Sequence, residues 1–303
     1  YGCRAWRSSG MAEPMDAAPF QLMPDDAPKK KRRSRASLRA SDRPFFIDGP
    51  AVISFSGGRT SAEMLRRILD AHDGELPDDV FVDFTNTGKE REETLVFVNE
   101  CSVRWGIPIT WLERPLGPHG DDIDEPKDRF RVVTFETASR NGEPFDDIIR
   151  ERGMVPRPRI RFCTEELKLR VMQNAMRSRG YEEWDRIVGL RYDEPKRVVT
   201  IRAAGHERGD VFCPLYDAKV TERDVLSAWK ARDFDLGLER WEGNCDLCML
   251  KSLSKRVRIM SDRPDLAAWW LDRDKISGGF SPGNPTYAQL ARRASALRLP
   301  MVI

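Results

Sequence analysis

The ten residues from Val52 to Ser61 constrain this chain more than any other segment of it. A short apolar run over residues 51–55 ends in the Ser-Gly-Gly turn at 56–58. Apolar residues then recur at the spacing of one helix face. The pattern predicts a buried strand, a glycine turn and a helix over 60–72 that opens directly from the turn.

This strand–turn–helix unit has the chemistry of a phosphate cradle. Its glycines let a ligand approach the backbone, and the free N–H groups of a first helical turn attract anions. Ser56, Thr60 and Ser61 add hydroxyl groups, and Thr60 with Glu63 fits a T-x-x-E capping box. Neither G-x-x-x-x-G-K-[ST] nor G-x-G-x-x-G is present. An ordinary glycine turn without a ligand is the alternative.

Predicted strands alternate with predicted helices along the chain from about residue 45. The strands are expected at 51–55, 80–84, 107–112 and 186–189, and the helices at 60–72, 90–105 and 164–179. This alternation predicts an α/β fold, with an open and mostly parallel sheet that carries helices on both faces. Ligands bind such sheets at the carboxyl ends of the strands, where 56–61 and 85–89 lie.

The charge distribution divides the 303 residues into three regions. Residues 1–44 hold ten Lys/Arg against five Asp/Glu, whereas the rest holds 41 against 44. We expect 1–44 to be a disordered basic tail, either merely solvated or in contact with nucleic acid. Residues 45–235 are expected to form a nucleotide-binding α/β domain with a loop-rich insertion near 115–160. Residues 236–303 then form a cysteine-bearing C-terminal segment with helices.

Composition also predicts the compartment. The chain has no run of 18 apolar residues and no apolar signal segment, so we expect no membrane partner. Six cysteines that include a C-x-x-C pair are typical of metal or catalytic sites in a reducing compartment. We therefore expect a cytoplasmic protein.

Five segments occur in the order found in a known family. The chain resembles the phosphoadenosine phosphosulfate (PAPS) reductase family of the PP-loop, adenine nucleotide α-hydrolase-like proteins. The matching segments are residues 54–61, 86–90, 161–168, 189–194 and 213–225. The resemblance covers most of residues 50–250 and implies a PP-loop that binds ATP, PAPS or adenylylsulfate, with Mg²⁺ if ATP is the substrate.

The resemblance also implies which residues form the site. Cys163, Lys168 and Arg191 would be catalytic. The nucleotide would be bound by residues of the first three segments, namely Ser56, Gly57, Gly58, Arg59, Thr60, Ser61, Asn86, Thr87, Gly88, Glu90 and Arg161. A cationic group is expected there because a nucleotide carries several negative charges, and Lys89 is a further candidate for this role.

The cysteines suggest a cofactor. Cys163 precedes a predicted helix and follows several arginines, which favours the thiolate. Cys245 and Cys248 follow it by 82 and 85 positions as C-x-x-C, similar to the iron–sulfur branch of adenylylsulfate reductases. That branch has a cysteine pair where this chain has Cys163 and Thr164, so Cys213 is the candidate fourth ligand, or one iron stays open. A [4Fe–4S] cluster, a zinc site and unmetallated thiols remain open.

The chain departs from the family in a second respect. PAPS reductases without a cluster use a cysteine near the C-terminus, but residues 292–303 contain none. We therefore expect sulfonucleotide reduction or, preferably, ATP-dependent adenylylation with sulfur transfer, assisted by an electron or sulfur donor protein. The alternatives are a nucleotide-binding or nucleic-acid-associated protein without turnover, and a zinc-stapled ATP pyrophosphatase. The sequence sets neither the acceptor nor the oligomeric state.

Overall fold

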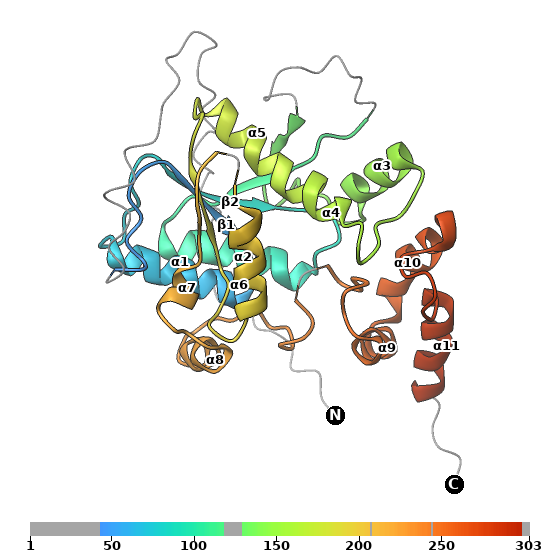
Figure 1. Ribbon diagram of the computed structural model, residues 1–303. Coiled ribbons are helices and arrows are strands. Elements are labelled where there is room, and N and C mark those ends of the chain that lie inside the picture. Colours follow the sequence, from blue (N-terminus) through green and yellow to red (C-terminus); the bar gives the residue numbers. More distant parts are fainter. Residues whose placement is uncertain (1–42, 118–128, 207, 244, 299–303) are drawn as a thin grey trace.

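The computed structural model describes residues 43–117, 129–206, 208–243 and 245–298. Its centre is a six-stranded sheet in the order β4-β3-β2-β1-β5-β6 (Figure 1). The strands are β1 (Ala51–Phe55), β2 (Val80–Thr85), β3 (Thr110–Glu113), β4 (Arg131–Val133), β5 (Asp185–Val188) and β6 (Val211–Phe212). All pairs are parallel except β3 with β4, so the predicted open, mostly parallel α/β sheet is confirmed.

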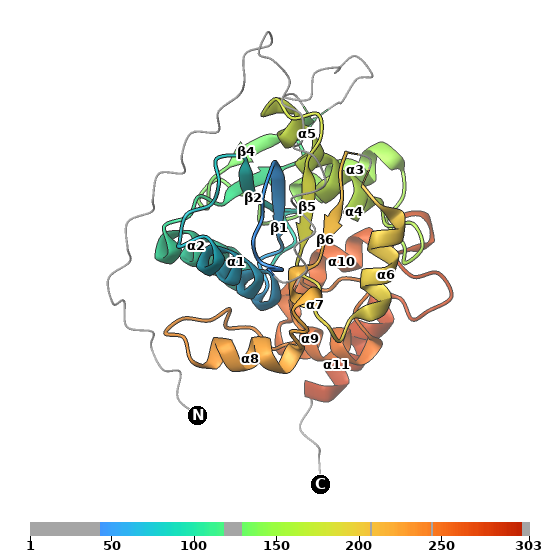
Figure 2. The same ribbon diagram turned by 60° about the vertical axis from the view of Figure 1, so that its left-hand side comes forward.

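Both faces of the sheet are covered, because β1 buries side chains in both directions. Ile53 and Phe55 join a core with α1 (Arg59–Ala71) and α2 (Glu92–Trp105). Val52 points the other way, into a core with α5 (Arg170–Ser178). Figures 1 and 2 accordingly show α1 and α2 on one side of the sheet and α5 on the other.

The C-terminal helices lie beside the sheet (Figure 1). Their buried side chains form a second hydrophobic core. They are α9 (Leu253–Asp262), α10 (Ala267–Arg273) and α11 (Tyr287–Arg298), with 3₁₀ turns at Pro264–Leu266 and Ile276–Gly278. Helix α3 (Glu143–Arg152) contributes Phe145, Ile148 and Ile149 to the same core.

Two predicted segments differ in detail from the structure. The region near 115–160, expected to be loop-rich, contains β4 and α3 in its described part. Helix α3 forms because its apolar side chains pack on C-terminal helices that are remote in sequence. The helix predicted over 164–179 starts earlier, as α4 (Phe162–Thr164) and a π-helical turn (Glu165–Leu169) that lead into α5.

The remaining helices lie along the β5–β6 side and beneath α1. They are α6 (Pro195–Ala204), α7 (Pro214–Asp217) and α8 (Glu222–Lys230). Thr221 caps α8 in a capping box with Asp224. Within the described ranges, each helix is too short or too polar to cross a membrane. The expectations for residues 1–42 lie outside the described residues.

Candidate functional site

The sheet order reverses at β1. From β1 the chain goes to β2 on one side, and the later strand β5 pairs with β1 on the other side. The carboxyl ends of β1 and β5 therefore flank a topological switch point, where open α/β sheets bind ligands. Residues 56–61 follow β1, and residues 189–194 follow β5. The fold thus brings two of the predicted site segments to one crevice.

Helix α1 presents an uncapped N-terminus to this crevice. Gly58 is its N-cap, and no side chain of the described residues caps it, so the predicted Thr60–Glu63 capping box is wrong. Glu63 instead pairs with Arg67 and Arg232. The free N–H groups of the first turn therefore stay available to an anion.

Ser61 organises the turn before the helix. Its hydroxyl donates to the carbonyl oxygen of Gly58 at 2.9 Å and accepts from the backbone N–H of Ser56 at 3.2 Å. The Ser56 hydroxyl donates to the Ser61 hydroxyl oxygen at 3.0 Å. These side chains hold the loop in a fixed shape, as a preorganised anion site requires.

The glycines of the site have different roles. Gly57 has φ +73°, and a Cβ atom there would meet the Thr94 side chain at 2.6 Å, so this glycine is required for packing on α2. Gly88, with φ +75°, is likewise required for close packing against the backbone of Gly142. At Gly58 a Cβ atom would meet only the Ser56 hydroxyl, at 3.8 Å, so the space beside this N-cap is open.

Arg191 reaches the loop from the β5 side of the crevice. Its Nη1 donates to the Thr60 hydroxyl at 3.0 Å, while Asp193 and Glu194 hold the same guanidinium. Its side chain is 19% exposed, so it can still meet a ligand. The structure therefore places Arg191 beside the predicted phosphate cradle.

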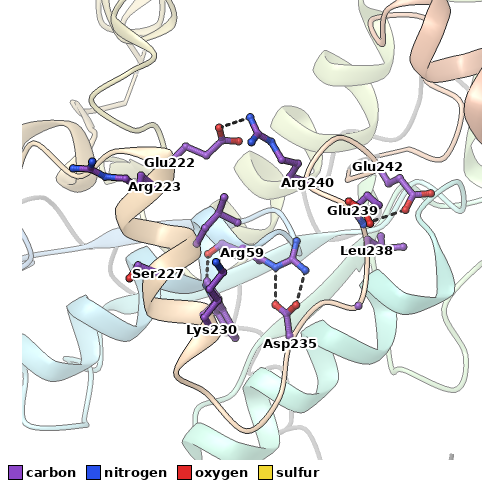
Figure 3. A pocket seen from close by; sticks show the side chains of 13 residues that line it. Arg59, Glu222, Arg223, Ser227, Lys230, Asp235, Leu238, Glu239, Arg240 and Glu242 are labelled. Atoms are coloured by element: carbon purple, nitrogen blue, oxygen red, sulfur yellow. Dashed lines mark hydrogen bonds and ion pairs between the residues drawn. The ribbon is translucent and has the colours of Figure 1, made fainter. Parts of the chain in front are cut away.

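Arg59, which we expected to bind phosphate, points away from the crevice. It forms two hydrogen bonds with Asp235, at 2.6 and 2.5 Å. Figure 3 shows this pair inside a neighbouring cavity of about 810 Å³ between α8 and the segment 235–242. An ion pair between Glu222 and Arg240 crosses the same cavity.

Asn86 supports the second segment from within. It is fully buried and donates to Glu113 at 2.6 Å and to the Ser139 carbonyl at 2.8 Å. Its Oδ1 accepts from the N–H of Gly88. Asn86 therefore fixes the loop after β2 and does not face a ligand, contrary to expectation.

Thr87 and Glu90 bring this loop to the cysteines. The backbone N–H and hydroxyl of Thr87 donate to Glu90 at 2.9 and 2.8 Å. The same hydroxyl lies 3.8 Å from the sulfur of Cys245. Lys168 approaches from the π-helical turn, with its Nζ 3.5 Å from Glu90.

Three of the four predicted metal ligands gather here. Cys163, Cys245 and Cys248 all pack on the C-terminal core, and all three interact electrostatically with one another. Burial lowers the pKa of Lys168, but the neighbouring Glu90 carboxylate opposes this, and the pKa lies above its usual value. A lysine that stays charged therefore lies next to the sulfurs.

The environment favours the protonated form of two of these thiols, Cys163 and Cys245. Burial, reinforced by Cys248, raises the pKa of Cys163 to about 11, although Lys168 and the backbone of Thr164 oppose the shift. Burial followed by Glu90 also raises the pKa of Cys245. The expectation of a Cys163 thiolate is wrong for the free protein, because loss of solvent outweighs the cations that the sequence shows.

Cys213 lies apart from the other three. It follows the edge strand β6 and packs with Leu190 and Val198 in a separate core cluster. Its charged neighbours are Arg202, Asp217 and Arg186, and burial raises its pKa. The structure does not bring it to the other cysteines.

Arg161 remains free at the edge of the cysteine site. It is exposed at the start of α4, and its guanidinium pairs with no carboxylate of the described residues. Lys89, by contrast, is buried in an ion pair with Asp246 at 3.0 Å, so it is not a free phosphate ligand. Sequence reasoning missed Asp246. Two sequence features could have indicated this ion pair: Asp246 lies between the two cysteines of the C-x-x-C pair, and Lys89 lies in the matched segment 86–90.

The fold and the two sites define an α/β protein with an uncapped helix N-terminus at its switch point and a partly buried three-cysteine site beside it. No protein-family model matches the chain. It is 33% identical over 213 residues to the uncharacterized nin region protein ORF290 of Escherichia phage lambda, which covers 67% of each protein. The chain belongs to the family of this phage protein.

A solved structure is also similar to the chain. It is the U34-tRNA thiolase NcsA from Methanococcus maripaludis with its [4Fe–4S] cluster. The match has a TM-score of 0.32 and 15% identity, and covers 82% of this chain and 72% of NcsA.

Proposed function

We propose that this protein is an enzyme of the PAPS reductase family that binds an adenine nucleotide in its PP-loop and uses it in sulfur transfer. The observation that carries the proposal is the juxtaposition of two sites at neighbouring strand ends. An uncapped helix N-terminus follows β1 and has Arg191 beside it, and Cys245 of the three-cysteine site lies against the loop that follows β2.

The nucleotide site acts through charge. The N–H groups of the first turn of α1 and the hydroxyls of Ser56 and Thr60 bind the phosphates. Arg191 adds a guanidinium, which suits a phosphate oxygen better than a point charge. Together they stabilise the negative charge that develops on the departing phosphate group when an acceptor is adenylylated.

An iron–sulfur cluster is the cofactor that we propose for the cysteine site, because cysteine thiolates are the usual ligands of such clusters. Among the described residues, no group of three or more His, Cys, Asp or Glu side chains is arranged to hold a metal ion. Cys163, Cys245 and Cys248 interact electrostatically with one another, and their side chains would have to rearrange to hold any metal. Cys163, Cys245 and Cys248 would hold a [4Fe–4S] cluster, which when bound leaves one iron free for a sulfur atom.

Metal analysis tests the cysteine assignment. We expect iron and acid-labile sulfide after anaerobic purification, both lost in Cys163→Ala, Cys245→Ala and Cys248→Ala. Cys213→Ala is the matched control and should keep the iron, because Cys213 lies in another core cluster. Zinc alone, or equal metal content in all four variants, would contradict the cluster.

Product analysis tests the reaction. Protein incubated with ATP, Mg²⁺, sulfide and an acceptor, supplied in turn as RNA, DNA or a small-molecule extract, should release pyrophosphate as the acceptor is adenylylated and AMP as sulfur displaces the adenylate. Release of sulfite from PAPS or adenylylsulfate with a thiol reductant would instead identify the reductase reaction. The enzyme proposal fails if no nucleotide is turned over with any sulfur donor.

A further inference from the structure

The C-x-x-C turn is clamped through its two middle residues, Asp246 and Leu247. Asp246 accepts from the indole N–H of Trp270 at 2.6 Å and pairs with Lys89 at 3.0 Å. The carbonyl oxygen of Leu247 accepts from the Tyr287 hydroxyl at 2.6 Å. All of these partners are buried, so the positions of both flanking sulfurs are set by contacts that water does not reach.

Lys89 joins this clamp to the loop after β2. Besides the ion pair, the carbonyl oxygen of Lys89 accepts from the backbone N–H of Asp246 at 2.9 Å. The two residues are therefore tethered twice, and they are only 6% and 2% exposed. A buried ion pair loses much of its attraction to desolvation, so stability alone is a weak reason for its presence. Burial indeed raises the pKa of Asp246 although Lys89 opposes the shift.

The same loop meets the cysteines directly. Thr87 contacts the Cys245 sulfur, and Glu90 connects Thr87 with Lys168, whose charge acts on Cys163. The loop also lies at the carboxyl end of β2, which is paired in register with β1 beside the nucleotide crevice. A shift of the loop would thus change the surroundings of both Cys245 and Cys163.

We propose that Lys89 and Asp246 are a positioning pair that transmits nucleotide occupancy of the crevice to the thiols of Cys245 and Cys248. This inference rests on the proposed function, since it requires a nucleotide at the PP-loop. The pair fixes the C-x-x-C turn to the loop at the carboxyl end of β2, the strand that pairs with β1 beside the crevice.

Alkylation of the two thiols tests the proposal in the full-length, metal-free, reduced protein. Peptide mass spectrometry gives the iodoacetamide rate of each cysteine with and without a non-hydrolysable ATP analogue and Mg²⁺. We expect the analogue to change the wild-type rate about fivefold, the lower range of measured couplings between sites. Lys89→Met and Asp246→Asn should abolish this change while the analogue still binds. Lys275→Met is the control, because it removes an exposed lysine–aspartate pair outside the site.

The outcomes separate this inference from the proposed function. If no nucleotide binds the wild-type protein, both are refuted. If the analogue binds but leaves the wild-type alkylation rates unchanged, or if Lys89→Met keeps the full response, only the inference is refuted. If the neutral variants do not fold, Lys89→Arg and Asp246→Glu replace them, because they keep the charges and alter the reach. An undiminished response in both would overturn the proposal.

Discussion

The crevice at β1 and the cysteine site beside it are built in opposite ways. The crevice comes from one continuous segment plus Arg191, and it offers backbone N–H groups, hydroxyls and an accessible guanidinium. The cysteine site is assembled from segments up to about 160 positions apart, its cysteines are partly buried, and raised pKa values keep Cys163 and Cys245 protonated. The first site is ready for an anion as it stands, whereas the second requires a metal or another event to change its charge.

A negative charge placed in the crevice tests most directly whether the crevice binds an anion. Gly58→Asp should reduce nucleotide affinity at least about 100-fold, because an unpaired like charge against a phosphate costs several kcal/mol. The fold should tolerate it, since the position has extended φ/ψ and open space, and aspartate is a favourable N-cap. Calorimetric titration measures the loss. Gly58→Ala, the control, should bind within about threefold of wild type.

The charge state of the cysteine site is tested by pH. In the metal-free protein, thiolate is the reacting species, and a pKa of about 11 leaves Cys163 almost entirely protonated at pH 8. Its alkylation at pH 8 should be about 100-fold slower than that of an ordinary thiol, and should rise with pH until about pH 11. A rate that levels off near pH 7 would show a thiolate and restore the expectation from the sequence.

Substitution of Arg191 tests whether the nucleotide is also bound from the β5 side of the crevice. Arg191→Met should weaken nucleotide binding about 10- to 100-fold, since a hydrogen bond to a charged group contributes about 1.5–3 kcal/mol. Arg197→Met is the matched control. Arg197 pairs with the same Glu194 but is 70% exposed and does not contact the loop. Equal losses in both variants would mean a general charge effect and no specific phosphate contact.

The difference in assembly also explains what the sequence could predict. Strand β1, the turn and helix α1 depend on neighbours in the chain, so the pattern around residues 51–71 predicted them almost to the residue. The grouping of Cys163 with the C-x-x-C pair followed from a resemblance, and the structure brings them together. The protonated state of Cys163 and Cys245 could not be predicted, because the desolvation that raises their pKa values depends on the packing of the remote C-terminal helices.

Side-chain partners were the least predictable part of the site. Arg59 and Lys89 were expected to meet phosphate, but Asp235 and Asp246 hold them. These aspartates lie more than 150 positions away in the sequence, outside the five segments that match the family. A basic residue next to a glycine turn therefore indicates a phosphate contact only after its acidic neighbours in space are known.

The smallest expected effect concerns the clamp, and adjacent tryptophans provide its control. Trp270 donates to Asp246, whereas the buried indole N–H of Trp269 has no partner among the described residues. Both change to phenylalanine with a similar loss of volume, but only Trp270→Phe removes a donor from a buried carboxylate. The free energy of unfolding of the Trp270→Phe variant should therefore fall by about 1–3 kcal/mol more than that of the Trp269→Phe variant. Urea denaturation measures both values.

Packing alone could mimic this difference, because Trp270 is more deeply buried than Trp269. Repeating Trp270→Phe in an Asp246→Leu background removes the hydrogen bond from the comparison. The cost should then shrink to the packing contribution. If it is unchanged in that background, the indole only fills space, and the cysteine turn is held by Lys89 and the Tyr287 hydroxyl without help from Trp270.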